Sequence, residues 1–182
     1  MVRKMLMAMM GVAILCTAAF AGDKQKGEGG KMGMEAMKAE MLKCYVCKNM
    51  ASKWDEIGPM GMESTKLNDG LLLSSWVKSE DPKKVEAYHA AAAACTKAVG
   101  ETLEWTDEQA KGGELCEWCQ DVRGALKSGA HFSSGSTKNG DMKVLTATDP
   151  AVQAKLAAMH EKCVMMIAMM EKPGAPATAH KE

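Results

Sequence analysis

The sequence predicts an α+β protein, a single helix-rich domain built from two tandem repeats of helix, β-hairpin and helix. Three features occur twice: a C-x-x-C pair, a turn sequence with Asn and Gly, and an Asp-Pro helix start followed by a third cysteine. In both copies this last cysteine follows the proline by thirteen residues. The correspondence indicates a duplication, and a pseudo-twofold is the simplest way to arrange two copies.

The beginning of the chain has the features of a secretory leader. A charged start precedes an apolar run from Met5 to Ala19, and Ala19-Phe20-Ala21 is a small-x-small cleavage site. We therefore expect residues 1–21 to be a signal peptide and the mature protein to be periplasmic or secreted. The apolar run is short for a membrane span and no second one follows, so we expect no membrane contact after leader removal.

The first repeat is predicted to span residues 34–100. It follows residues 22–33, which are rich in Lys and Gly and are expected to form a flexible tether. Apolar residues recur at three-and-four spacing from Met34 to Ala51, which predicts one helix that ends before Gly58.

A hairpin and a second helix complete this repeat. The turn sequence N-D-G, ending at Gly70, predicts the hairpin. Asp81 is a suitable N-cap with Pro82 at the first helical position, and Gly100 is the expected end of the helix.

The second repeat is predicted to span residues 101–170 with the same order of elements. Thr106 and Gln109 have the spacing of a capping box for its first helix. Gly112 and the glycine after it are expected to break or kink this helix, so that a new helix begins near Cys116.

The remaining elements complete the symmetry between the repeats. An Asn-Gly turn at Gly140 predicts the second hairpin, and Asp149 with Pro150 predicts the start of the last helix. Because a lone hairpin is marginally stable in water, we expect the two hairpins to pair into one small sheet. Residues 171–182 are expected to be a disordered tail.

Composition narrows the classes of function. The chain has 23 basic and 23 acidic residues, so no excess of positive charge suggests nucleic acid as a partner. Motifs of serine hydrolases, phosphate-binding loops and H-E-x-x-H metalloproteases are missing from the sequence, which favours a protein that is not an enzyme.

Cysteine is the residue type that indicates chemistry. One of the seven cysteines, Cys16, lies in the predicted leader. The others occupy equivalent positions of the two copies and are Cys44, Cys47, Cys95, Cys116, Cys119 and Cys163. Three thiols per copy cannot all pair within a copy as disulfides, whereas metal coordination has no such restriction.

Each copy therefore contains a candidate metal site. In the second, Cys116, Cys119, His160 and Cys163 make a set suited to tetrahedral zinc. In the first, Ala92 replaces the histidine, so three thiolates remain. Thirteen of the 18 methionines lie outside the predicted leader, and three thiolates with nearby methionine suit Cu(I) equally well. We therefore expect zinc or copper as the bound metal, either in two centres or in one shared centre.

Three hypotheses for function follow from this pattern. The first is an exported, non-enzymatic protein that binds zinc or copper through its two cysteine clusters, for metal buffering or delivery. The second is a structural or interaction module stapled by disulfides, without metal. The third is a periplasmic thiol–disulfide oxidoreductase, which Cys44 does not favour because it is predicted to lie well inside a helix.

Overall fold

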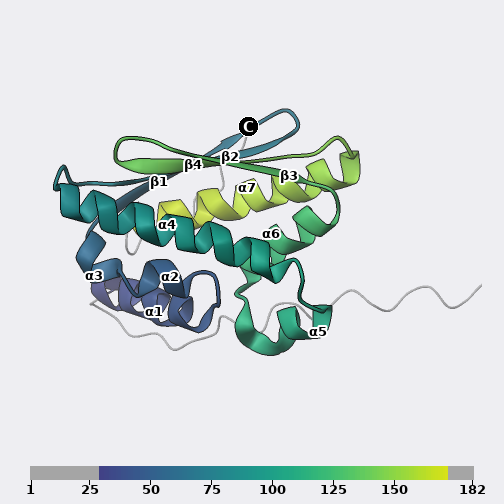
Figure 1. Ribbon diagram of the computed structural model, residues 1–182. Coiled ribbons are helices and arrows are strands. Elements are labelled where there is room, and N and C mark those ends of the chain that lie inside the picture. Colours follow the sequence, from purple (N-terminus) through teal and green to yellow (C-terminus); the bar gives the residue numbers. More distant parts are fainter. Residues whose placement is uncertain (1–28, 172–182) are drawn as a thin grey trace, which may run out of the picture.

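The computed structural model describes residues 29–171 and confirms the α+β fold, with helices below a four-stranded antiparallel sheet (Figure 1). The helices are α1 (Gly29–Lys43), α2 (Lys48–Ala51), α3 (Trp54–Ile57), α4 (Pro82–Thr102), α5 (Asp107–Gln109), a π-helical turn η1 (Ala110–Glu114), α6 (Glu117–Lys127) and α7 (Pro150–Glu171). The strands are β1 (Met60–Lys66), β2 (Gly70–Val77), β3 (His131–Ser136) and β4 (Gly140–Thr146).

The two hairpins pair into one sheet, as predicted from the weakness of a lone hairpin. The strand order is β1-β2-β4-β3, so the hairpins meet through their second strands. Leu73 lies opposite Lys143 at the middle of the β2–β4 ladder, with Leu71 opposite Leu145 on one side of this pair. This register is compatible with the predicted pseudo-twofold, which stays a prediction from the sequence together with the duplication.

The long helices α4 and α7 cover one face of the sheet, whereas no helix of residues 29–171 covers the other face. Leu71 and Leu145 point to the helices and are fully buried, while Trp76 and Met142 point the other way and are exposed. The main core contains Leu71, Val122, Ala125, Leu145, Ala147, Val152, Leu156 and Met159. Each fully buried large apolar side chain in it contributes about 1.5–3 kcal/mol to stability.

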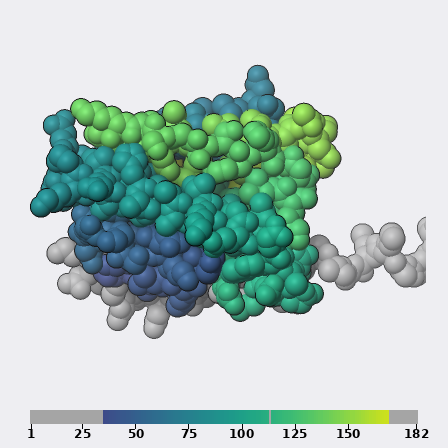
Figure 2. Space-filling view, in the orientation of Figure 1, coloured from purple at the N-terminus to yellow at the C-terminus, as the bar shows by residue number. Residues whose placement is uncertain are grey.

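The helices α1, α2 and α3 form a further layer. The short α2 and α3 pack against α4 on the side away from the sheet. In the space-filling view, α4 lies between these N-terminal helices and the strands (Figure 2). The N-terminal segment is therefore held to the rest of the molecule in large part through the contacts of α2 and α3 with α4.

Most of the predicted helix starts are confirmed. Asp81 caps α4 by accepting a hydrogen bond from the Lys83 backbone N–H, and Thr106 with Gln109 forms the complete capping box of α5. The expected end of α4 at Gly100 is wrong, because that glycine does not adopt positive φ and the helix continues to Thr102.

The single helix predicted from Met34 to Gly58 is wrong. The chain instead forms α1, α2 and α3, with a turn at the first C-x-x-C motif. The physical reason is a tertiary hydrogen bond, since the Tyr45 N–H donates to the Glu114 carbonyl at 2.7 Å instead of continuing the helical ladder. The helix α1 also begins at Gly29, so residues 29–33 of the predicted tether are helical.

Three of the predicted segments fall outside the described residues. They are the signal peptide at 1–21, residues 22–28 of the tether, and all but the first residue of the tail at 171–182. Between residues 29 and 171, no helix combines the length and the apolar character needed to cross a membrane.

Candidate metal centre

The first C-x-x-C motif forms a tight turn between α1 and α2. Cys44 follows the last residue of α1, and its backbone N–H donates to the Met41 carbonyl at 3.1 Å. Cys47 precedes α2 and its carbonyl accepts from the Ala51 N–H at 3.0 Å. The prediction that Cys44 lies well inside a helix is wrong, and the turn brings both cysteines of the pair to the second C-x-x-C motif.

The second C-x-x-C motif lies at the start of α6, as the two preceding glycines predicted. Cys116 is the N-cap of this helix, with an extended backbone at φ −67° and ψ 162°. Cys119 lies one turn inside α6 and is buried. The side chain of Gln120 donates to the Leu115 carbonyl at 2.9 Å, which supports the extended residue before the cap.

The four cysteines of the two motifs lie together. Among residues 29–171, Cys44, Cys47, Cys116 and Cys119 form a group in which all four sulfur atoms are within 4.8 Å of one another. The Cys47 sulfur lies 3.7 Å from that of Cys116 and 3.5 Å from that of Cys119. A tetrahedral ion with metal–sulfur bonds of about 2.3 Å requires sulfur atoms about 3.8 Å apart. The group can therefore hold one metal ion, with the thiols of both repeats as ligands.

The thiols interact strongly with one another. The pKa of Cys44 lies far below its usual range because its thiolate accepts hydrogen bonds from the thiols of Cys116 first, then Cys119 and Cys47. The pKa of Cys116 is lowered to about 7, mainly by the hydrogen bond from Cys119. The pKa of Cys119, the donor in this network, is raised. Metals bind the thiolate form, so a cation would compete with the protons that these four thiols share.

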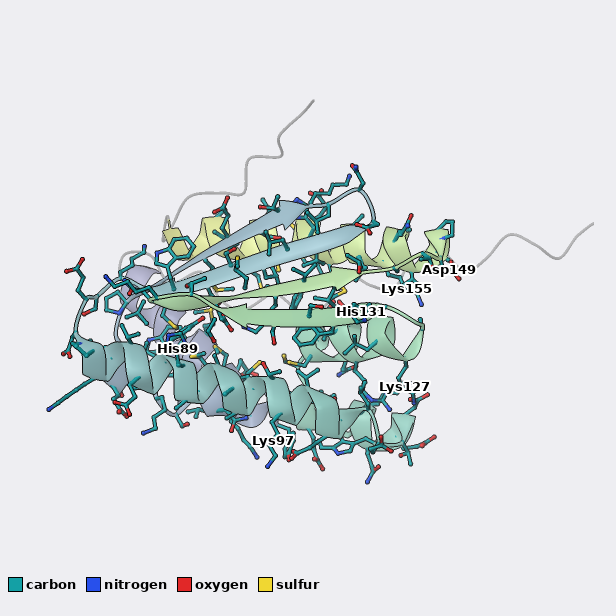
Figure 3. All side chains as sticks on the ribbon, turned by 45° about the horizontal axis from the view of Figure 1, so that its top comes forward. His89, Lys97, Lys127, His131, Asp149 and Lys155 are labelled. Atoms are coloured by element: carbon teal, nitrogen blue, oxygen red, sulfur yellow. The ribbon has the colours of Figure 1, made fainter. Side chains whose placement is uncertain are left out.

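An apolar shell surrounds these sulfur atoms. Buried residues of α4, η1 and the two motifs form a cluster, with members Cys44, Val46, Ala98, Ala110, Leu115 and Cys119. The half-buried indoles of Trp105 and Trp118 pack against it. Figure 3 shows sulfur atoms (yellow) among the side chains of the molecule, and the labelled His89 and Lys97 lie on α4. An apolar shell limits access of water to the centre and strengthens its electrostatic interactions.

Cys95 lies beside the centre but outside the group of four. Its thiol donates to the Val46 carbonyl at 3.4 Å, within the first motif. Burial raises the pKa of Cys95, so its thiol stays protonated at neutral pH.

Cys163 and His160, which were predicted to complete a site with the second motif, are directed elsewhere. The helix α7 packs along β1 and β2, and His160 Nδ1 lies 2.8 Å from the Ser64 hydroxyl on β1. Cys163 is buried, and desolvation raises its pKa to about 11 although a hydrogen bond with Ser64 partly offsets the effect. The structure therefore assembles the two C-x-x-C pairs with each other and not with the third cysteines of their own copies.

Sequence reasoning left a shared centre open but assigned the ligands copy by copy, so it did not identify this pairing of the two C-x-x-C motifs. The signal for it was the second C-x-x-C motif itself, because four thiolates in two such pairs are the usual ligand set of a structural zinc site. Long separation concealed the signal, since Cys47 and Cys116 are 69 residues apart.

Comparison with protein-family models, with curated proteins and with solved structures gave no match to this chain. The chemistry of the four-cysteine group is therefore the basis for a functional assignment.

Proposed function

We propose that this chain is an exported, non-enzymatic metal-binding protein with one tetrathiolate centre, formed by Cys44, Cys47, Cys116 and Cys119. The observation that carries the proposal is the approach of all four sulfur atoms to within 4.8 Å of one another. Sulfur atoms at 3.5 and 3.7 Å are too far apart for a disulfide and have the spacing of ligands that share an ion.

Zinc is the metal that we assign to the centre. Four thiolates in a tetrahedral arrangement are typical of zinc or iron, whereas the copper alternative rested on three thiolates and nearby methionine. In the part of the chain that the structure describes, this candidate ligand group consists of cysteines alone. Elemental analysis distinguishes zinc from copper and iron directly.

A structural role fits this geometry better than metal delivery. A site with four protein ligands is closed, whereas exchange of a metal with a partner needs an open position. Two of the ligands, Cys44 and Cys119, are also buried. The ion would cross-link the N-terminal helices to α6, and binding of a structural zinc ion couples directly to folding.

The test is metal analysis combined with thiol counting on protein purified from the periplasm without added metal. We expect about one zinc ion per chain and four thiols that become reactive only after chelation. Copper or iron at the same stoichiometry would change the metal that is assigned but would leave the four-cysteine centre as proposed. Absence of both metal and free thiols would instead support the disulfide-stapled module and overturn the proposal.

Export is a separate part of the proposal and needs its own measurement. The predicted leader at 1–21 supports it. Expression of the full chain in a bacterial host, followed by fractionation and mass determination, should give a periplasmic product that begins at Gly22. A full-length cytoplasmic product would contradict export without affecting the metal centre.

Thiol–disulfide exchange is the second candidate, and the position of Cys116 favours it. The residue is half-buried at the N-terminus of α6, where the helix dipole stabilises a thiolate, and Cys119 lies one turn away as a resolving partner. The metal-free protein should then reduce insulin disulfides in the presence of a thiol reductant. Inactivity of this form, with all four thiols reduced, would remove the candidate.

A further inference from the structure

Tyr45, the second residue of the first C-x-x-C motif, contacts residues near the end of α4 and at the start of α2. Its ring lies 4.9 Å from the ring of Trp105, centroid to centroid, and its hydroxyl donates to the Glu101 carboxylate at 2.6 Å. The Lys48 ammonium lies 4.4 Å above the centre of the same ring. The side chain thus contacts an indole, an ammonium group and, through its hydroxyl, a carboxylate.

The partners of Tyr45 are themselves fixed. Arg123, which is buried on α6, donates to the Thr102 carbonyl at 2.8 Å and also to the Trp105 carbonyl. It pairs with Asp107 at 2.9 Å as well. The turn that carries Trp105 is therefore attached to α6, the helix that contributes the second cysteine pair.

The backbone of the first motif is fixed in the same direction. The Tyr45 N–H donates to the Glu114 carbonyl at 2.7 Å, two residues before Cys116. The side chain of Asn49 donates to the carbonyls of Tyr45 and Val46 at 3.3 and 3.0 Å. These bonds hold the motif in its turn and against the second motif without any contribution from a metal.

We propose that Tyr45 is the positioning residue of the metal centre, which holds Cys44 and Cys47 against Cys116 and Cys119 before the ion binds. This inference rests on the proposed metal-binding function. Tyr45 contributes no ligand atom, and its effect is to reduce the conformational freedom that the first motif loses on metal binding.

The experiment compares three variants with the wild type, Tyr45→Phe, Tyr45→Ala and Tyr88→Phe. The last is a matched control, because the Tyr88 hydroxyl also donates to a carboxylate, that of Asp141 at 2.5 Å, but in a different core cluster. Metal affinity is measured by chelator competition at a temperature at which all metal-free variants are folded. We expect losses of roughly three- to tenfold for Tyr45→Phe and 10- to 100-fold for Tyr45→Ala, and less than about twofold for Tyr88→Phe.

Two further readouts separate positioning from a general structural role. The Co²⁺-substituted variants should keep the absorption spectrum of four thiolate ligands, since the ligand set is unchanged. A role in overall stability alone would lower the melting temperatures of the metal-free and metal-loaded forms equally and leave the affinity unchanged, which would overturn the inference. Glu101→Ala, which removes the acceptor of the Tyr45 hydroxyl, should reproduce Tyr45→Phe, and the double variant should be no weaker than either one.

The outcomes also distinguish this inference from the proposed function. A wild-type protein that binds no metal overturns both. A wild-type protein that binds one ion, with Tyr45→Ala binding it as tightly, leaves the centre in place and overturns the role of Tyr45 alone.

Discussion

The two C-x-x-C motifs share a sequence pattern but differ in backbone. In the first, Cys47 has helical φ and ψ and precedes a helix of only 4 residues. In the second, Cys116 is extended and caps a helix of 11 residues whose inner face reaches the main core through Val122 and Ala125. The second motif is therefore supported by its own helix, whereas the first depends on contacts with the other repeat.

The third cysteines of the two copies differ as well. Cys95 hydrogen-bonds to the first motif at the edge of the four-cysteine group, whereas Cys163 is buried near β1 and contacts Ser64. Equivalent positions in the sequence thus have different surroundings in the structure. The lesson is that repetition of a motif predicts which residues are chemically active, but not which copy supplies their neighbours.

The largest effect is expected from removal of one ligand from either motif. Cys44→Ser and Cys119→Ser each remove one ligand, and a shared centre needs both cysteine pairs. Each substitution should lower metal affinity by more than about 100-fold, which exceeds the loss caused by changing a residue that only supports a ligand. Chelator competition checks this, with Cys163→Ser as a control of the same chemical change. Retention of one ion by Cys44→Ser would show that the second motif binds metal by itself. The first motif would then not be part of a shared centre.

Alkaline pH should destabilise the folded protein through Cys163. Its folded-state pKa of about 11 lies above the ordinary value of 9.0, so above pH 9.0 the unfolded chain releases this proton first. Stability should therefore fall between pH 9.0 and about 11, by about 3 kcal/mol at most. Denaturant titrations at a series of pH values measure the loss, and Cys163→Ser should remove this part of it. An equal slope in the variant would assign the alkaline loss to other groups.

Removal of the metal should loosen the first motif more than the second. The amides of Tyr45 and Lys48 should exchange with solvent about tenfold faster after chelation, because their segment has no long helix of its own. The amide of Gln120, which bonds to the Cys116 carbonyl at 3.0 Å within α6, should change less. Hydrogen exchange followed by mass spectrometry measures both segments in one sample. Equal acceleration in the two motifs would show that α6 also depends on the ion.

The smallest effect is expected from Cys95→Ser. Its thiol lies outside the group of four, so metal stoichiometry should stay at one and the affinity should change by less than about threefold, the value of a single weak hydrogen bond. Elemental analysis and chelator competition measure this. Loss of the ion in this variant would instead show that Cys95 is a fifth ligand. Cys95 would then no longer be only a neighbour of the ligands Cys44 and Cys47.

Much of the fold follows from local sequence signals. Asp81 with Pro82, the Thr106–Gln109 capping box and the two Asn/Asp-Gly turns each act over a few residues, so the elements that they start or connect were predicted correctly. The chemistry of the cysteines was also apparent from the sequence, because residue type and three-residue spacing determine what a C-x-x-C pair can bind.

Tertiary contacts decided the rest. The break at Cys44 depends on a hydrogen bond from Tyr45 to Glu114, a residue far along the chain, and helical periodicity contains no information on such a partner. The choice of partners for each cysteine pair likewise depends on how α6 and α7 pack, with His160 and Cys163 directed to Ser64. The sequence by itself determined the elements and the ligand type, whereas only the packing of the two repeats determined which four thiols meet.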